Sequence, residues 1–385
     1  MSMFYELMMR KKEQIMYATI KGTLTENDGV FSGFSASNYL KLQQPFSSNE
    51  NWIISLKLKT SNVANTSTEY IFGSTNGSDR SILLGYGGGL FKLWLSSNGT
   101  AWDIVSGIGT YTLQANTDYY VRLSYINSAY KFEISTDNIN WVDGGTISST
   151  TPIYNNSILY FGACWDKSTN YMKGDGNFDL NNSYIKIGST KYNLQAVVGY
   201  TVVGSPTIVD GVVSGFSSGN YLYLPSAPSW SNIDILETFT TFTTSTMNTL
   251  QIVMGSRYSQ ATCCVEITSA NKPLFRITYS DSGGTTKYKE TTINYVLSAN
   301  TKYKVKNYFN KQTLVIKSEL YDENGIMLAS ASSSLASDYT SIANINDFWY
   351  GYNPQRGTFS GSIDFNNNNT YIKINNKLWF NGQQA

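Results

Sequence analysis

The sequence has few residues that could act as catalytic acids or bases, and their spacing does not suit catalysis. The sequence of 385 residues contains no histidine, so it lacks the usual general base and the commonest metal ligand. Glycoside hydrolysis needs two carboxylates, one for the sugar carbon and one for the leaving oxygen. The nearest acid pair is Asp234 and Glu237, and residues three apart point to opposite faces of a strand. We therefore predict that the protein is not an enzyme and that Glu237 is an exposed strand position.

Two segments rich in Asp and Asn offer the oxygen ligands that calcium prefers. One contains Asp175, Asp179 and Asn181, and the other contains Asp364 with residues 366–369. Such residues also form ordinary turns, because their side chains bond the backbone of their own turn. The sequence predicts no cofactor, and calcium is the one metal that these loops could bind.

The overall composition excludes several other classes of protein. The 28 Lys+Arg residues balance 27 Asp+Glu residues, whereas a nucleic-acid binder needs an excess of cations for the phosphates. The three cysteines, at positions 164, 263 and 264, have neither zinc-site nor disulfide-framework spacing. We expect them to be small buried apolar residues in a protein made in a reducing cytoplasm. No stretch of about 18 apolar residues predicts a membrane-spanning helix.

Aromatic side chains are better candidates for function, since the chain has 29 Tyr, 18 Phe and 8 Trp. Sugars pack their C–H faces on Trp and Tyr rings, while Asn, Asp and Arg hydrogen-bond the hydroxyls. A tryptophan can equally be a core anchor, which is what we expect of Trp349 and, among the tyrosines, of Tyr160. The candidates for ligand contact are Trp102, Trp141, Trp165, Asp166, Trp230, Tyr352 and Arg356.

An internal repeat organises the chain that must position these residues. Residues 28–42 read DGVFSGFSASNYLKL and residues 210–224 read DGVVSGFSSGNYLYL, at an offset of 182. Four further matches follow in the same order, at offsets between 184 and 189. Such a period is too long for a solenoid unit and indicates one domain used twice. We predict an N-terminal segment at residues 1–16, a first domain at 17–198 and a second at 199–385. The offset of 182 aligns Glu237 with Ser55, with a slip of one residue allowed.

Each half of the repeat has the pattern of many short strands. Apolar and polar residues alternate over residues 119–125 and 131–135, on either side of a short connection, which predicts a hairpin. Asn98-Gly99 and Asn324-Gly325 are strong turn signals, because both residue types tolerate positive φ. Helical periodicity is hardly visible beyond residue 20. The fold class is therefore all-β, a sandwich or a barrel.

The motif DGV-x-SGFS-x-x-NYL and the later segments GSID and YIKI resemble the concanavalin A-like lectin/glucanase superfamily. More narrowly, they are similar to laminin-G-like or pentraxin-like jelly-roll modules of bacteriophage tail and virion proteins. The resemblance covers about residues 17–385 and implies two tandem jelly-roll β-sandwiches. It also implies that segments 361–364, 371–375 and 377–379 form the last strand pair, beside the first.

By this resemblance we expect a virion structural protein from a phage tail, fibre or head surface, made in the host cytoplasm. Its lectin-like modules would attach to host-surface glycans; the alternative is a purely architectural decoration or spacer without glycan binding. The expected partners are other virion proteins, further copies of the chain and a host glycan. Neither nucleic acid nor membrane insertion is expected.

The first sixteen residues call for a separate interpretation. Phe4, Leu7 and Met8 have the spacing of one helix face, and three basic residues follow them at positions 10–12. A secretion signal has the opposite order of charge and apolar residues. The segment could be a docking peg for the virion or an ordinary frayed terminus.

Overall fold

The computed structural model describes residues 14–43, 49–76, 79–155, 158–163, 170–224, 233–256, 263–342, 348–354 and 356–384. Within these residues the regular elements are β-strands and one short 3-10 turn, η2 (Asn366–Asn368), so the fold class is all-β. The chain divides into two compact units, Met1–Ala196 and Val197–Ala385. The predicted boundary after Val198 lies two residues further along. In the described part of the chain, no helix has the length and apolar character needed to cross a membrane.

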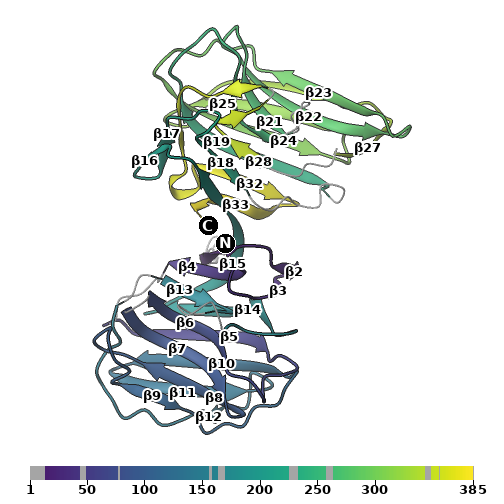
Figure 1. Cartoon of the computed structure of the whole chain (residues 1–385). Coiled ribbons are helices and arrows are strands. Elements are labelled where there is room, and N and C mark those ends of the chain that lie inside the picture. Colours follow the sequence, from purple (N-terminus) through teal and green to yellow (C-terminus); the bar gives the residue numbers. More distant parts are fainter. Residues whose placement is uncertain are drawn as a thin grey trace, which may run out of the picture. The chain divides into compact units, whose positions relative to one another are not determined.

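The first unit consists of two antiparallel sheets (Figure 1). In hydrogen-bonded order, its front sheet contains β1 (Gln14–Lys21), β4 (Tyr39–Gln43), β13 (Ile158–Phe161), β6 (Glu69–Asn76), β7 (Asp79–Gly87), β8 (Leu90–Leu95) and β9 (Val105–Ile108). Its back sheet contains β2 (Thr25–Asn27), β3 (Val30–Ser32), β14 (Asn177–Ile187), β5 (Trp52–Lys59), β10 (Asp118–Ile126), β11 (Ala129–Ser135) and β12 (Val142–Asp143).

The second unit repeats this arrangement. Its front sheet contains the end of β15 (Thr190–Val203), then β18 (Tyr221–Leu224), β28 (Phe348–Tyr350), β20 (Gln251–Ser256), β21 (Cys264–Ile267) and β22 (Pro273–Asp281), which pairs with both β23 (Thr286–Thr292) and β27 (Tyr339–Ile342). Its back sheet contains β16 (Thr207–Val209), β17 (Val212–Ser214), β31 (Ser362–Asp364), β19 (Ile235–Thr243), β24 (Lys302–Asn310), β25 (Val315–Asp322) and β26 (Met327–Ser334).

The chain ends as the resemblance implies. β32 (Thr370–Ile374) pairs with β19 and forms a hairpin with β33 (Lys377–Gln384), and β31 pairs with the early strand β17. A small separate hairpin, β29 (Tyr352–Asn353) with β30 (Gly357–Thr358), lies between β28 and β31 in the sequence.

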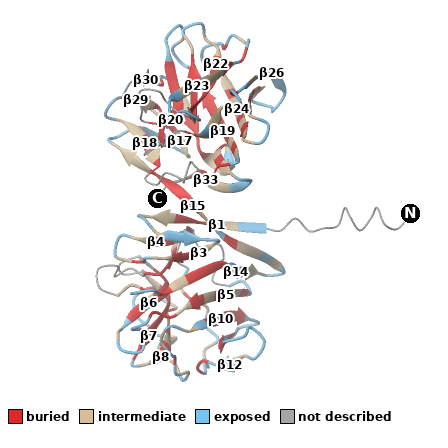
Figure 2. Ribbon diagram, turned by 90° about the vertical axis from the view of Figure 1, so that its right-hand side faces the viewer, coloured by how far each residue is buried: buried red, intermediate tan, exposed pale blue. Residues whose placement is uncertain are grey.

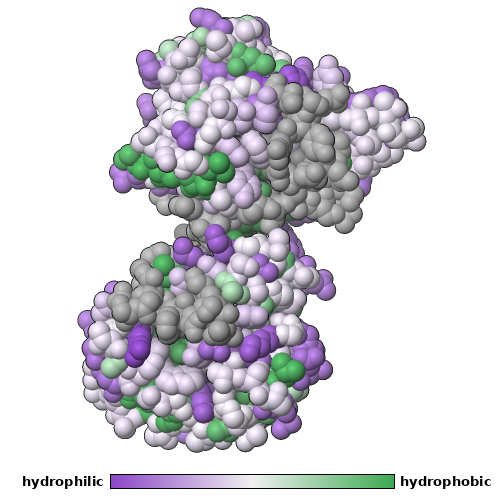
Figure 3. Space-filling model, in the orientation of Figure 1, coloured by the Kyte–Doolittle hydropathy of each residue, from purple (hydrophilic) through white to green (hydrophobic). Residues whose placement is uncertain are grey.

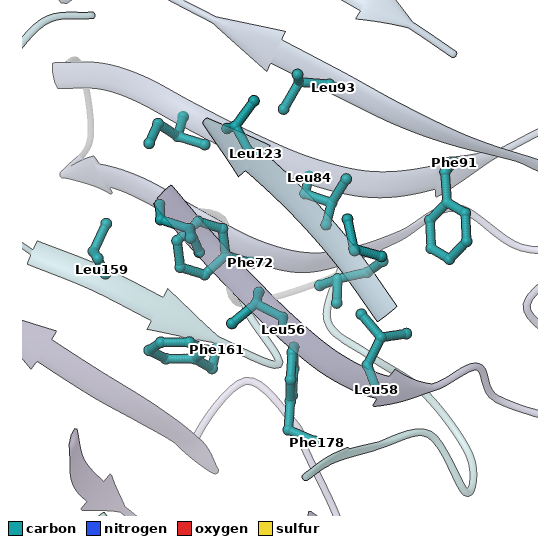
Figure 4. Packing of buried hydrophobic residues seen from close by; sticks show 14 of the residues in the cluster. Leu56, Leu58, Phe72, Leu84, Phe91, Leu93, Leu123, Leu159, Phe161 and Phe178 are labelled. Carbon is teal, nitrogen blue, oxygen red and sulfur yellow. The ribbon is translucent and has the colours of Figure 1, made fainter. Parts of the chain in front are cut away.

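The core of the first unit fills the space between its sheets. Leu56 of β5 and Phe178 of β14 point inward from the back sheet, toward Phe72 and Leu84 of the front sheet (Figure 4). These side chains are 4% exposed or less, and burying one of them stabilises the fold by roughly 1.5–3 kcal/mol. Figure 2 shows buried residues on the strands and exposed residues mainly on the connections. The alternating sequence pattern therefore becomes an inner and an outer face for each sheet.

The repeated motifs make the same backbone contacts in both units. The Leu180 N–H donates to the Gly29 carbonyl at 2.9 Å, and the Phe365 N–H donates to the Gly211 carbonyl at 3.0 Å. Both glycines have positive φ, 78° and 71°, which only glycine adopts at little cost. The repeated motif thus makes the same backbone hydrogen bond in each unit, which joins the first hairpin to a segment near the end of that unit.

The predicted alignment of Glu237 with Ser55 is wrong by two residues. In the two YIKI segments, Lys186 pairs with Ile53 and Lys373 pairs with Glu237, so Glu237 corresponds to Ile53. The offset taken from the first motif does not hold here, because the segment between β18 and β19 differs in length from its counterpart between β4 and β5. A slip of two keeps the side chain on the same face of the strand.

Candidate ligand-binding site

The outer face of the front sheet in the second unit, which is turned away from the back sheet, carries a stack of aromatic rings. Leu222 and Phe348 point to the core, so their neighbours Tyr221 and Trp349 point outward. The Tyr221 and Trp349 rings are nearly parallel, at 6°, with centroids 4.3 Å apart. The Tyr352 ring completes the group, with its centroid 5.7 Å from that of Tyr221 and 5.9 Å from that of Trp349.

This aromatic face is accessible on its tyrosines. Tyr221, Tyr223 and Tyr352 are half-buried, while Trp349 is 6% exposed. Tyr223 is paired with Trp349 across neighbouring strands. Trp349 is therefore buried as predicted, but on the outer face of the sheet rather than between the sheets. Half-exposed rings on a rigid strand form a surface on which the apolar face of a ligand can stack.

The first unit carries a related but different face. Tyr39 and Tyr160 lie with their ring centroids 5.6 Å apart, at 68°, in a cluster separate from the main core. Tyr160 is thus buried, as predicted, but outside the space between the sheets. At the position of Tyr223 the first unit has Lys41, which pairs with Tyr160. This face therefore has a lysine in place of one ring of the second unit, and its two tyrosines are not stacked in parallel.

The hairpin β29–β30 holds Arg356 beside the aromatic face. The Arg356 N–H donates to the carbonyl of Asn353 at 3.2 Å and to its Oδ1 at 3.1 Å. At the base of the hairpin, Gly351 has a φ of 81°. A Cβ at Gly351 would lie 2.0 Å from the Phe216 ring, so a larger residue cannot be accommodated without displacing that ring. The local sequence therefore determines a tight chain reversal that projects both Tyr352 and Arg356.

A buried carboxylate lies under this arginine. The Glu266 side chain is 2% exposed, and its Oε1 lies 3.6 Å from both Arg356 Nε and Arg276 Nη1. Arg276 also donates from Nε to Glu290 at 2.7 Å. Burial raises the pKa of Glu266, although the positive charge of Arg276 opposes the shift. The result is a chain of alternating charges, Arg356, Glu266, Arg276 and Glu290, which runs from the hairpin across β21, β22 and β23.

Two nitrogens of this network are left without hydrogen bonds. Arg276 Nη1 and Arg356 Nε are buried and have no hydrogen-bond partner among the described residues. Their distance of 3.6 Å to Glu266 is beyond hydrogen-bonding range. Buried donors are normally satisfied, so each exception calls for an explanation.

The predicted contact residues fall into separate places. Tyr352 and Arg356 are brought together on one hairpin, whereas Trp102 and Trp141 lie in the first unit. Trp102 follows the front-sheet strand β8, and Trp141 precedes the back-sheet strand β12. Each half-buried ring has an arginine over it, Arg80 at 5.6 Å and Arg122 at 4.0 Å, in a cation–π contact. The three other candidates, Trp165, Asp166 and Trp230, lie outside the described residues.

Sequence reasoning missed several residues of the aromatic face and the charge network. Tyr221 was not among the predicted contact residues, and the strand alternation over residues 221–224 is the signal that could have placed its ring outside the core. Nothing local to the sequence joins residues from β18, β21, β22 and β28. The missed residues are Tyr221, Tyr223, Trp349, Glu266, Arg276 and Glu290.

The loops considered for calcium already contain their own cations. Asp179 accepts from Lys57 Nζ at 2.9 Å, and Asp364 accepts from Lys302 Nζ at 2.8 Å. Burial would raise the pKa of each aspartate, but the lysine hydrogen bond and charge outweigh it and lower the pKa. No group of three His, Cys, Asp or Glu side chains suited to a metal occurs among the described residues. These donor sets do not fit calcium.

The Asp and Asn side chains of these segments bond backbone groups, either in their own turn or in a distant segment. Asp175 Oδ1 accepts the Asn62 N–H at 2.7 Å, and Asn181 Nδ2 donates to the Asp28 carbonyl at 2.7 Å. Asp179 also accepts the N–H of Asn182 at 3.1 Å. The turn-forming interpretation is confirmed for Asp179 and for Asp364, which accepts the Asn366 N–H at 3.0 Å. Asp175 and Asn181 instead bond distant segments.

The acid pair is held by lysines on the back sheet. Glu237 lies 3.0 Å from Lys306 Nζ and 3.2 Å from Lys373 Nζ. Its side chain is 17% exposed, so the prediction of an exposed position is wrong; neighbouring strands on both sides cover it. Burial would raise the pKa of Glu237, but the hydrogen bonds from Tyr371 and Lys306 prevail and lower it. A general acid needs the opposite shift.

The described cysteines match the prediction. Cys263 and Cys264 are free and fully buried, and burial raises the pKa of both thiols. Low-pKa, accessible thiols are the reactive ones, so these two are packing residues. Cys164 lies outside the described residues.

No family model matches the chain, and no curated protein matches its sequence. Among solved structures, domains LG4-5 of the mouse laminin α1 chain are 14% identical, with a TM-score of 0.33 over 95% of this chain and 93% of that one. The binding domain of botulinum neurotoxin DC is 14% identical, with a TM-score of 0.34 over 86% and 94%. The enzymatically active domain of bacteriophage CBA120 tailspike protein 2 is 11% identical, with a TM-score of 0.34 over 49% and 32%. Likenesses at this level carry no argument about function.

Proposed function

We propose that this chain is a bacteriophage virion structural protein that attaches to host-surface glycans and has no enzymatic activity. The observation that carries glycan binding is the aromatic face of Tyr221, Trp349 and Tyr352, with Arg356 beside it. The phage source rests on the resemblance of the repeated motifs to virion modules. The proposal that the chain has no enzymatic activity rests on the missing histidine and on Glu237 of the acid pair, which is bound by two lysines.

The geometry suits a sugar ring. The C–H face of a sugar would pack on Tyr221 and Tyr352, while the Arg356 guanidinium would donate to ring substituents. Arg356 is fixed from below by Glu266 at 3.6 Å, and the hairpin fixes its backbone. A preorganised side chain loses less entropy when the ligand binds.

Attachment by a virion protein would use many copies. A single shallow aromatic face binds weakly, but several copies on one particle raise the effective affinity by roughly 10²–10⁴. We accordingly propose that the chain is made in the host cytoplasm, assembles with other virion proteins and copies of itself, and acts on the particle surface.

The test is binding of the full chain to host cells and to a glycan array. The variant carrying Tyr352→Ala and Arg356→Ala should bind at least about tenfold more weakly. The control is Trp94→Ala, which removes an aromatic ring packed against Tyr70 in the first unit and should leave binding unchanged. Undiminished binding by a correctly folded double variant would remove this face from the proposal.

A purely architectural role is the second candidate, and a specific observation favours it. The turns β11–β12 and β25–β26 occupy corresponding places in the two units, and each exposes an isoleucine. Ile139 is 79% exposed and Ile326 is 63% exposed, next to Met327 at 56%. Exposed apolar tips of this kind can contact a neighbouring protein. If Ile139→Ser with Ile326→Ser blocks incorporation into particles and the Tyr352 variant leaves host attachment intact, the architectural role is favoured.

A further inference from the structure

A groove of about 340 Å³ lies at the β16–β17 hairpin of the second unit. It is formed by elements of the back sheet, whereas the aromatic face belongs to the front sheet. Its volume is at the lower end of the range for small-molecule sites, roughly 300–1,000 Å³. The lining residues are Thr207, Val209, Val212, Ser214, Thr243, Thr244, Ser245, Ser360, Gly361 and Ser362.

The floor of the groove is one face of the hairpin. Thr207 is paired with Ser214, and Val209 is paired with Val212, so two hydroxyls and two isopropyl groups form adjacent rows. Val209 is 61% exposed. Figure 3 shows an apolar band on the surface in this region of the second unit. The groove thus offers an apolar surface bordered by hydroxyls.

Only some of these hydroxyls have a structural role. Thr244 Oγ1 donates to the Ser298 carbonyl at 2.6 Å, and Ser360 Oγ donates to Gln251 Oε1 at 2.7 Å. The remaining hydroxyls make no side-chain hydrogen bond to another described residue. They belong to Thr207, Ser214, Thr243, Ser245 and Ser362.

The corresponding place in the first unit is charged. Lys59 is paired with Asn177 there, as Thr243 is paired with Ser362 in the second unit. Asp175 stands at the position of Ser360, where each side chain accepts a backbone N–H from the same turn, at 2.7 Å and 3.1 Å. The same backbone thus carries a lysine and an aspartate in one unit and only hydroxyls in the other.

We propose that this groove is a second ligand site, which binds an uncharged sugar unit independently of the aromatic face. The C–H groups of the sugar would pack on Val209 and Val212, and its hydroxyls would exchange hydrogen bonds with the free Ser and Thr hydroxyls. None of the ten described lining residues carries a charge. Lys302 and Asp364, which pair with Thr243 and Val212 across the sheet, already neutralise each other at 2.8 Å, so an ionised group would gain no free counter-ion there. The lining therefore selects for a neutral ligand.

The first unit supplies a variant that should fold. Ser360→Asp and Ser362→Asn install the residues that already stand at these positions in the first unit, where Asp175 keeps the matching turn contact. Thr243 is kept, because a lysine there would stand opposite Lys302, where the first unit has Asp118. In the full chain, saturation-transfer NMR and calorimetry would be run with maltotetraose, cellotetraose and chitotetraose. We expect at least one probe to bind, with affinity at least about tenfold lower in the groove variant. Asn177→Ser in the first unit, the reverse of Ser362→Asn at the corresponding position, is the matched control and should leave probe binding unchanged.

The outcomes separate this site from the aromatic face. Binding that survives Tyr352→Ala with Arg356→Ala but not the groove variant supports the groove. The inference is overturned if none of the three probes binds, if the groove variant binds equally well, or if oligogalacturonate binds more tightly than the neutral probes. It is also overturned if the aromatic-face variant alone abolishes neutral-sugar binding. Loss of host attachment in that variant bears only on the proposed function.

Discussion

The two units neutralise the same buried aspartate with lysines from different strands. In the first unit Asp179 is bonded to Lys57 of β5, at 2.9 Å. In the second unit Asp364 is bonded to Lys302 of the next strand, β24, at 2.8 Å. What the two units share is therefore a balanced charge at one partly buried point of the sheet, because an unpaired carboxylate there would be costly.

Each unit has a different residue at the position where the other unit has its lysine. Thr241 of the second unit pairs with Asp364 as Lys57 pairs with Asp179. Asp118 of the first unit stands where the second unit has Lys302, since each pairs with the same residue position of the adjoining strand. The lysine that neutralises the aspartate therefore lies on adjacent strands in the two units, while the strand pairing around it is the same.

The outer faces of the front sheets differ more strongly. The strand register places Arg276 where the first unit has Trp94, and Glu266 where it has Gly85. Trp94 packs against Tyr70, with ring centroids 6.5 Å apart. A buried ion network is commonly no more stable than apolar packing of similar volume. The network in the second unit therefore favours a role in binding over a role in stability.

The largest effect should come from Glu266→Ala, which leaves Arg276 and Arg356 without their shared carboxylate. Breaking a buried pair on one side costs about 3–5 kcal/mol, and Glu290, which remains on Arg276, places the expected loss near the lower figure. Urea unfolding of the full chain measures the change in free energy of unfolding. Gly85→Ala in the first unit is not a valid comparison, because a Cβ there would lie 2.6 Å from the Glu69 carbonyl. A loss below about 1 kcal/mol would show that the network is not tightly coupled.

A smaller loss, similar in the two units, is expected when Gly351 or Gly162 is replaced by alanine. Both glycines have positive φ, 81° and 76°, and in each case a Cβ would lie 2.0 Å from a phenylalanine ring, of Phe216 or Phe34. Strain and overpacking together should cost roughly 2–3 kcal/mol. Thermal unfolding of each variant checks this, and a large difference between the two would break the correspondence of the two corners.

The exchange of lysines can be reproduced in the first unit. Lys57→Thr should destabilise it by about 1–2 kcal/mol, because Asp179 loses a charged hydrogen bond at a partly exposed site. Adding Asp118→Lys in a background that also carries Lys59→Thr copies the second unit, where Lys302 stands opposite Thr243, and should restore most of the loss. A double-mutant cycle measured by urea unfolding provides the test. If the second change gives no recovery, the two lysine positions are not equivalent.

The loss of stability caused by Lys57→Thr should depend on pH. The folded-state pKa of Asp179 is lowered, so its ionised form stabilises the fold above the ordinary aspartate pKa of about 3.9. That stabilisation is lost as the pH falls through the lower folded-state value. The difference between wild type and Lys57→Thr should therefore be full at pH 7 and shrink below about pH 4. A difference that grows in acid would contradict the assignment.

The smallest effect on stability is expected at the exposed turn tips. Ile326→Ser and Ile139→Ser remove side chains that are 63% and 79% exposed, so each should change the free energy of unfolding by no more than about 0.5 kcal/mol. Their effect should appear instead in self-association, measured by sedimentation. Marked destabilisation by one of them would show that its turn packs against the rest of its unit.

Much of the fold was predictable from local patterns. The repeated DGV motif, the period-two alternation and the Asn-Gly turns depend on neighbours in sequence, so a single chain reveals them. The alignment of Glu237 failed because the offset of one motif does not extend past a connection of different length. Half of the predicted contact residues that the structure describes, Tyr352 and Arg356, lie on one hairpin, since they are only four positions apart.

By itself, the sequence determined that the chain is all-β, that one domain is used twice, and that a histidine-based active site is absent. Only the tertiary structure decided that Trp349 lies on an outer face, that Glu266 lies beneath Arg356, and that Lys57 and Lys302 serve corresponding aspartates. The physical reason is strand pairing. Alternation states that neighbouring side chains point to opposite faces, but which strands lie side by side, and in which register, depends on contacts far apart in the chain.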